Sequence, residues 1–99
     1  MARRLDPVSP GEVLLEDFMR PLDLSINRLA RDIGVAPNRI SAIVNGKRSI
    51  TADTALRFAR YFGVTAQTWL NLQSGYELRL AQRALGKRIE HTVKPRSAA

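Results

Sequence analysis

The chain has 99 residues, 44% of them hydrophobic, which is enough for one small globular domain with a single core. It contains no cysteine, and this excludes disulfide bonds, thiolate zinc sites and cysteine nucleophiles. Lys and Arg outnumber Asp and Glu by 16 to 9, so the formal net charge of +7 favours a polyanionic partner. The sequence has neither an apolar run long enough to span a membrane nor an N-terminal segment typical of a signal peptide, so we expect a cytoplasmic protein with no membrane partner.

Five helices and no strand are predicted from the helix caps and the spacing of hydrophobic residues. Ser9, Ser25 and Thr51 are suited to cap helix N-termini, and Pro or Gly residues mark where helices end. The predicted helices cover residues 10–20, 26–33, 37–45 and 52–62, and a fifth opens at Thr65 and includes Leu80. In the fourth helix, Leu56 is expected on the buried face together with Phe58.

The second and third predicted helices have the spacing of a helix-turn-helix over about residues 25–45. A tight turn that contains Gly34 joins them. On the third helix, Ile40, Ile43 and Val44 lie on one side, whereas small and polar residues lie on the other. We therefore expect the first side to pack in the core and the second side to enter the major groove of DNA.

The polar side of the third helix carries the candidate base-reading residues. Asn38 can pair with the N6 and N7 atoms of adenine, Ser41 can hydrogen-bond to either base type, and Ala42 offers a methyl group to thymine. Arg39 flanks this side and can reach guanine or a phosphate. Outside a helix-turn-helix the same residues would be ordinary solvated positions, so their predicted role depends on the motif.

Residues near the helix ends are candidate contacts to the DNA backbone. Lys47 and Arg48 directly follow the third helix, and we expect them to contact phosphate or a neighbouring base edge, although two cations are also ordinary in a solvated loop. The N-terminus of the second helix at Ser25 can present backbone amides to a phosphate. Pro37 and Asn45, at the two ends of the third helix, complete the candidate set.

Charged residues outside the motif have simpler interpretations. Four arginines are expected to be solvated or paired with Asp32 and Asp53 rather than to bind DNA; they are Arg28, Arg31, Arg57 and Arg60. Three acidic residues lie in the first turns of an exposed helix, where they favour the helix dipole; they are Glu12, Glu16 and Asp17. A contact between these acidic residues and a basic partner protein is the alternative.

The sequence predicts neither catalysis nor a cofactor. His91 is the only histidine and lies near the C-terminus, so no histidine cluster can hold a metal and no base on a rigid element can activate a nucleophile. We therefore expect a protein that is not an enzyme and that needs no metal or cofactor.

The chain resembles the Cro/C1-type helix-turn-helix family over residues 24–63, LSINRLARDIGVAPNRISAIVNGKRSITADTALRFARYFG. Within that family it is similar to the HigA-type antitoxins of toxin-antitoxin modules, through PGEVLLEDFMRPL before the motif and WLNLQSGYELRLA after it. The most specific parts are Asn-Gly-Lys-Arg at residues 45–48 and Trp-Leu-Asn-Leu-Gln at residues 69–73. Glu77 stands where the HigA pattern has aspartate, which is a conservative change.

The resemblance implies an all-α fold, namely a five-helix, lambda-repressor-like DNA-binding domain. It implies a homodimer that binds a palindromic operator in double-stranded DNA and represses its own operon. It also implies an antitoxin that neutralises a HigB-type toxin, an mRNA-cleaving ribonuclease.

We expect the chain to have three parts: an N-terminal arm (1–9), a domain that ends in a dimerisation helix (10–84) and a basic, flexible tail (85–99). The candidate core or dimerisation residues on the last helix are Trp69, Leu70, Leu72, Tyr76 and Leu78. The tail cations are expected to be solvated, with a supplementary nucleic-acid arm as the alternative; they are Lys87, Arg88, Lys94 and Arg96.

Two other functions fit part of the sequence. A freestanding or phage-type repressor without a toxin partner would share every DNA-contacting residue. A non-specific RNA-binding or nucleic-acid-binding module driven by charge would show little preference between operator and random duplex. The chain lacks the aromatic residues interleaved with cations that such a module uses to stack on single strands.

Overall fold

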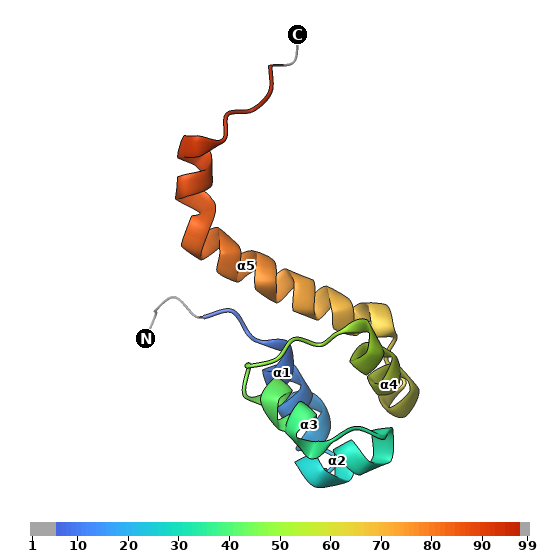
Figure 1. Cartoon of the computed structure of the whole chain (residues 1–99). Helices are drawn as coiled ribbons and strands as arrows, with labels where there is room; N and C mark the ends of the chain where they lie inside the picture. Colours follow the sequence, from blue (N-terminus) through green and yellow to red (C-terminus); the bar gives the residue numbers. More distant parts are fainter. Residues whose placement is uncertain (1–5, 98–99) are drawn as a thin grey trace.

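The computed structural model of the protein describes residues 6–97, in which helices are joined by short loops and no strand occurs (Figure 1). In chain order the helices are α1 (Pro10–Val13), η1 (Leu14–Met19), α2 (Ile26–Ile33), α3 (Pro37–Val44), α4 (Ala52–Phe62) and α5 (Ala66–Thr92). Because η1 continues α1 directly, the described chain has five helical segments, and the predicted all-α fold is confirmed. The segments up to α4 form a globular part, and α5 leaves it as a long helix (Figure 1).

The first helix begins where it was predicted but changes type after one turn. Ser9 is its N-cap, and the Ser9 hydroxyl accepts a hydrogen bond of 3.1 Å from a backbone N–H of the first turn. The following residues form a π-helix, in which the N–H of Arg20 donates to the carbonyl of Leu15, five residues earlier. Because this wider turn brings residues five apart near one another, Leu14 and Met19 are both buried in the core.

Aromatic residues from three helical segments close the core. Trp69 of α5 is fully buried, and its ring centroid lies 4.9 Å from the centroids of Phe18 and of Phe58. Phe62 completes the cluster, 5.0 Å from Phe18. Fully burying a large apolar side chain stabilises a fold by roughly 1.5–3 kcal/mol, so Trp69 fixes the first turns of α5 against α4 and η1.

The predicted hydrophobic faces of α2 and α3 are buried, whereas that of α4 needed one correction. The buried residues of α2 and α3 are Leu29, Ala30, Ile33, Ile40 and Ile43. On α4, Ala55 and Phe58 are buried, but the Leu56 side chain is 64% exposed. Leu56 lies about 100° around the helix from Ala55, beyond the edge of the buried stripe.

The last helix is longer than the sequence patterns predicted. We expected a flexible tail from residue 85, but α5 continues to Thr92. Residues 81–92 contain no proline and are mostly good helix formers, and Pro95 then disfavours a helical backbone at the residue before it. No helix of the described chain is both long and apolar enough to cross a membrane.

Candidate nucleic-acid interface

A turn of three residues, 34–36, joins α2 directly to α3, which is the connection expected of a helix-turn-helix. Gly34 ends α2 with a φ of 77°, a left-handed conformation that favours glycine. The N–H of Val35 donates to the carbonyl of Ala30 at 3.0 Å, which closes the end of the helix. Pro37 then occupies the first turn of α3, where its missing N–H costs nothing.

The N-termini of α2 and α3 lie beside each other and line a shallow hollow of about 510 Å³. The hollow brings together four of the predicted site residues, Ser25, Pro37, Asn38 and Ser41, with Ile26 and Asn27. Asn27 was not predicted as a site residue. Its position in the first turn of α2, two residues after the Ser25 cap, was the available signal, because this turn faces the start of α3.

The exposed side of α3 is polar, as predicted. The Asn38 side chain is exposed, whereas Ser41 and Ala42, on the next turn of α3, are half-buried. Asn45 lies one turn further along, and its amide Nδ2 donates a long hydrogen bond of 3.5 Å to the Ser41 hydroxyl. Asn38, Ser41 and Asn45, spaced three and four residues apart, therefore form a polar strip along one side of the helix, with the methyl group of Ala42 beside it.

Arg39, a predicted contact to a base or a phosphate, forms its bonds within the protein. Its Nη1 lies 2.6 Å from Oδ2 of Asp53 and donates to the Thr54 hydroxyl at 3.3 Å, both on α4. The Arg39 side chain is only 25% exposed, because the buried Thr54 and the first turn of α4 lie against it. Arg39 joins α3 to α4 and is not part of the exposed polar strip.

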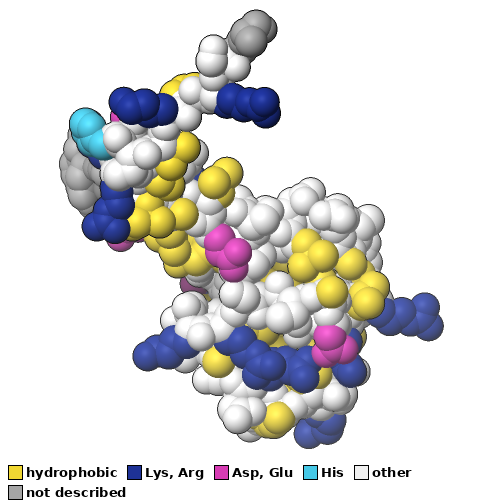
Figure 2. All heavy atoms as spheres, turned by 45° about the horizontal axis from the view of Figure 1, so that its top comes forward, with side chains coloured by type: hydrophobic (Ala, Val, Ile, Leu, Met, Phe, Trp, Pro, Cys, Tyr) yellow, Lys and Arg dark blue, Asp and Glu magenta, His cyan; other side chains and the backbone are white. Residues whose placement is uncertain are grey.

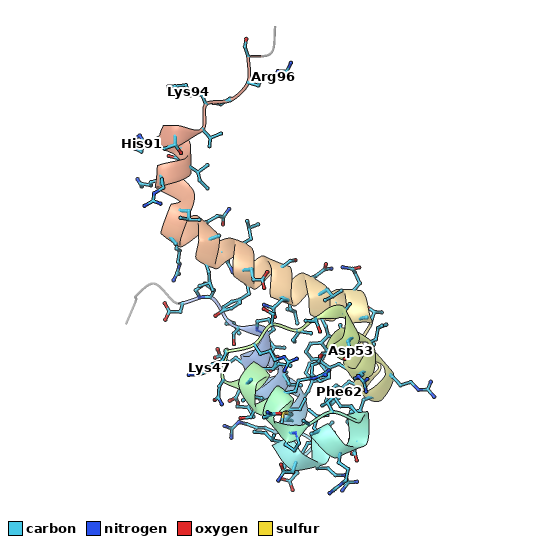
Figure 3. All side chains as sticks on the ribbon, in the orientation of Figure 1. Lys47, Asp53, Phe62, His91, Lys94 and Arg96 are labelled. Carbon is cyan, nitrogen blue, oxygen red and sulfur yellow. The ribbon has the colours of Figure 1, made fainter. Side chains whose placement is uncertain are left out.

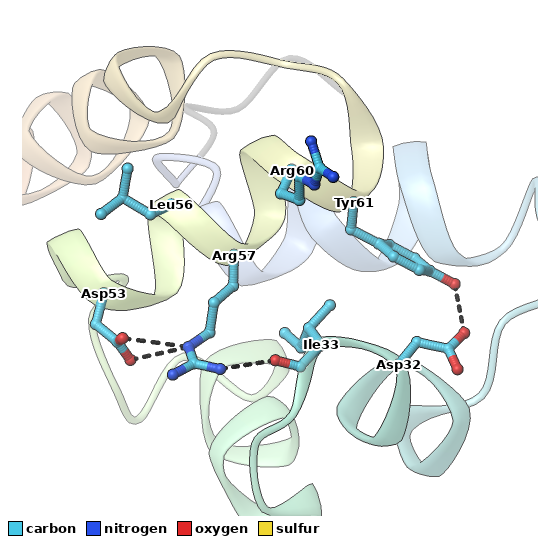
Figure 4. A pocket seen from close by; sticks show the side chains of 7 residues that line it. All are labelled: Asp32, Ile33, Asp53, Leu56, Arg57, Arg60 and Tyr61. Atoms are coloured by element: carbon cyan, nitrogen blue, oxygen red, sulfur yellow. Dashed lines mark hydrogen bonds and ion pairs between the residues drawn. The ribbon is translucent and has the colours of Figure 1, made fainter.

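Two aspartates connect the helices behind this strip (Figure 4). Asp53 also pairs with Arg57, whose Nη1 donates to the carbonyl of Ile33 at 2.8 Å. The hydrogen bonds from Arg39 and then from Arg57 lower the pKa of Asp53 below its ordinary value. The pKa of Asp32, on α2, is also lowered below its ordinary value.

The Tyr61 hydroxyl donates to Asp32 at 2.6 Å, and Arg28 pairs with the same carboxylate. The hydrogen bond from Tyr61 is the largest cause of the lowered pKa of Asp32, and the same bond raises the pKa of Tyr61. The predicted pairing of Arg28 and Arg57 with these two aspartates is confirmed. These links hold α2, α3 and α4 as one unit.

The loop after α3 presents the two predicted cations. Gly46, with a φ of 75°, turns the chain, and the N–H of Lys47 donates to the carbonyl of Ala42 at 2.8 Å. The Lys47 and Arg48 side chains are exposed, and within residues 6–97 neither forms a hydrogen bond or an ion pair. Figure 3 shows Lys47 at the outer edge of the globular part, on the other side from Asp53. Both cations are thus available to an external anion.

The five predicted core or dimerisation residues of α5 divide by burial. Trp69 is in the core; Leu70, Leu72 and Tyr76 are half-buried; and Leu78 is 59% exposed. Beyond Leu78 the helix carries the exposed hydrophobic residues Leu80, Leu85 and Ile89, and the exposed Val93 follows its last residue. Figure 2 shows hydrophobic side chains grouped on this arm, with Lys and Arg side chains at its end and across the globular part.

The basic residues of the predicted tail lie far from the polar strip. Lys87 and Arg88 are on the last turns of α5, and Lys94 and Arg96 follow the helix (Figure 3). His91 also lies in the last turn of α5. Among the residues that the structure describes, no three His, Cys, Asp or Glu residues are grouped so that they could hold a metal ion.

Comparison with known proteins agrees with this geometry. Residues 15–69 match the family model described as Helix-turn-helix. The chain is 51% identical over 75 residues to virulence-associated protein I of Dichelobacter nodosus, which covers 76% of this chain and 69% of that protein.

Two solved structures are similar over nearly their whole length. One is the antitoxin HigA of Pseudomonas aeruginosa with the higBA promoter, which has a TM-score of 0.89, 44% identity, and coverage of 92% of this chain and 99% of that chain. The other is an addiction module antidote protein of the HigA family from Coxiella burnetii, which has a TM-score of 0.87, 47% identity, and coverage of 92% and 99%.

Proposed function

This chain belongs to the Cro/C1-type helix-turn-helix family, in its branch of HigA antitoxins, and we propose that it represses its own operon and neutralises a HigB-type ribonuclease toxin. One observation carries the proposal. The polar strip of α3 carries the exposed Asn38 and Asn45, and the two exposed cations after it have no ionic partner within residues 6–97, on a chain similar over nearly all its length to an antitoxin solved with its promoter. The family is one of DNA-binding regulators rather than enzymes.

In the proposed complex, α3 lies in the major groove of double-stranded operator DNA. Asn38 pairs with an adenine edge, with Ser41 and Ala42 as the neighbouring base contacts. Lys47 and Arg48 neutralise phosphates, and Ser25, Pro37 and Asn45 lie against the backbone at the helix ends. Asn27 joins this set because it lines the same hollow as Asn38.

We propose that the protein binds its operator as a homodimer through α5. A dimer would place two copies of α3 about 34 Å apart in successive major grooves of a palindromic site. The exposed residues Leu78, Leu85 and Ile89 support this role, since exposed large hydrophobic side chains grouped on one helix mark an interaction surface.

The proposal is tested by co-expressing the protein with the open reading frame next to its gene and measuring the mass of the purified complex by size-exclusion chromatography with light scattering. The sample is then titrated onto the upstream intergenic DNA and onto a random duplex at two salt concentrations. A stable heterocomplex that prefers the intergenic DNA, and that binds more weakly at high salt, is expected.

Two outcomes would contradict the proposal. A dimer that binds the intergenic DNA but has no protein partner would be a freestanding repressor. Equal affinity for intergenic and random duplexes would instead indicate binding driven by charge alone.

A further inference from the structure

The loop that carries Lys47 and Arg48 is anchored at both ends, but by different parts of the molecule. At its start, the capping bonds of Gly46 and Lys47 attach it to α3. At its end, the buried Ile50 side chain lies in the core and the Ile50 backbone N–H donates to Oε1 of Gln73, on α5, at 2.8 Å. Thus α5, which contributes no predicted DNA contact, holds the far end of the loop.

A second bond from α5 reaches the middle of the loop. The Ser49 hydroxyl donates to Oε2 of Glu77 at 3.1 Å, and Nε2 of Gln73 donates to the same oxygen at 2.9 Å. Since a backbone N–H can only donate, Gln73 must turn its oxygen toward Ile50 and its NH₂ group toward Glu77. The hydrogen bonds therefore determine the orientations of both the Gln73 and the Glu77 side chains.

These bonds explain where the cations point. With Ser49 and Ile50 attached to α5, the two preceding residues are held between two fixed ends of the loop, and their side chains are exposed. A hollow of about 220 Å³ lies between this loop, α1 and α5, and its lining includes Lys47, Arg48, Gln73 and Glu77. The loop and the α5 network are therefore parts of one site.

We propose that Gln73 and Glu77 are positioning residues for DNA binding, which hold the loop from α5 so that Lys47 and Arg48 meet phosphates. This inference rests on the proposed DNA-binding function. Because the residues act through the two cations, their loss weakens binding to every duplex alike, whereas the loss of a base contact reduces only the preference for the operator.

We call the hydrogen bond from the Ile50 N–H to the Gln73 side chain the tether. The first test replaces Gln73 with an apolar side chain of similar size. Gln73→Leu removes both hydrogen bonds of the amide, and we expect about tenfold weaker binding to operator and to random duplex, with a smaller dependence of affinity on salt. Hydrogen exchange of the Ile50 amide in the free protein should become about tenfold faster, because its acceptor is gone. Gln67→Leu is the matched control, because it removes an exposed glutamine whose amide bonds only to Asn71 within α5, and it should leave both quantities within about threefold.

The second test exchanges the two partners. In the double variant Gln73→Glu with Glu77→Gln, a carboxylate accepts from Ile50, and the NH₂ group of the amide on the next turn donates one hydrogen to that carboxylate and the other to the Ser49 hydroxyl oxygen. The net charge and all three bonds are retained, so DNA affinity and Ile50 exchange should return to within about threefold of the wild type.

Three outcomes would overturn the inference: a Gln73→Leu protein that binds DNA like the Gln67→Leu control, a loss limited to the operator, or a double variant as weak as Gln73→Leu. Circular dichroism at the assay temperature checks that each variant is folded. Wild-type protein that showed no preference for its operator would overturn the proposed function instead, and the Ile50 exchange rates would still report whether the tether exists.

Discussion

Gly11 and Ile43 are in direct backbone contact: a Cβ atom on Gly11 would lie 2.7 Å from the carbonyl carbon of Ile43 and closer still to its oxygen. Glycine at residue 11 therefore lets α1 pack against the end of the helix that carries the polar strip. Pro10 and Gly11 are both buried there.

Gly11→Ala should destabilise the fold strongly, although alanine favours helices. The methyl group has no space and must move backbone rather than a flexible side chain, so we expect a loss of about 3 kcal/mol, at the upper end of overpacking effects. Denaturant unfolding measures it. Gly86→Ala on α5 is the control, because a Cβ there meets no atom within 4 Å, and it should stabilise by up to about 1 kcal/mol. Similar values for the two variants would show that α1 can move away from α3 at no cost.

Asn38 and Lys47 should respond differently to truncation. Asn38→Ala should cost roughly 1–3 kcal/mol on the operator and relax the preference at one base position, because a base contact is lost. Lys47→Ala should weaken operator and random duplex alike and reduce the salt dependence by about one phosphate contact. Fluorescence anisotropy on both duplexes at several salt concentrations separates the two. Equal losses on both duplexes for Asn38→Ala would remove it from the base-reading set.

Asp53 should make stability depend on pH in the acid range. Its pKa is lowered in the folded protein, chiefly by Arg39, so its contribution is present above the unfolded value of about 4 and is lost as the pH falls through the lower folded value. Asp53→Asn should therefore reduce the melting temperature at pH 7, and the difference from wild type should shrink toward pH 3. Asp17→Asn makes the same charge change at an exposed residue that forms no ion pair within residues 6–97 and should have less effect. A difference that persisted at pH 3 would mean that Asp53 acts through packing.

Leu78 should be required for the proposed dimer. Leu78→Arg places a charge where we expect an apolar contact, and the dissociation constant of the dimer should rise more than about tenfold. Light scattering over a range of protein concentrations measures the change. Leu56→Arg alters a side chain of similar exposure on α4 and should leave the dimer intact. Loss of the dimer only in the Leu56 variant would move the interface to α4.

Local chemistry made most helix starts predictable. Ser9, Ser25 and Thr65 are N-caps whose hydroxyls accept backbone hydrogen bonds, and such caps depend only on residues three positions away. Thr51 occupies the predicted cap position of α4, but its side chain makes no capping bond.

What the sequence did not reveal depends on distant partners. Arg39 pairs with a residue 14 positions away, and Gln73 with a backbone group 23 positions away. The pattern of a single helix places Arg39 beside the polar strip. Its side chain is long enough to reach the Asp53 carboxylate instead, and that carboxylate is near only because α3 packs on α4. Gln73 is the last residue of the Trp-Leu-Asn-Leu-Gln run that resembles the HigA pattern. Its bond to Ile50 could not be predicted, because it depends on the loop lying against α5.

The tether from Gln73 holds a backbone amide and not a side chain. Any residue except proline can supply that N–H, so the bond places no other demand on the identity of residue 50 beyond the need to fill the core. Substitutions on the exposed side of α3 likewise leave the tether untouched. The proposed base-reading residues can therefore diverge between related proteins while the loop proposed to bind phosphate keeps its shape, which would separate the evolution of specificity from that of affinity.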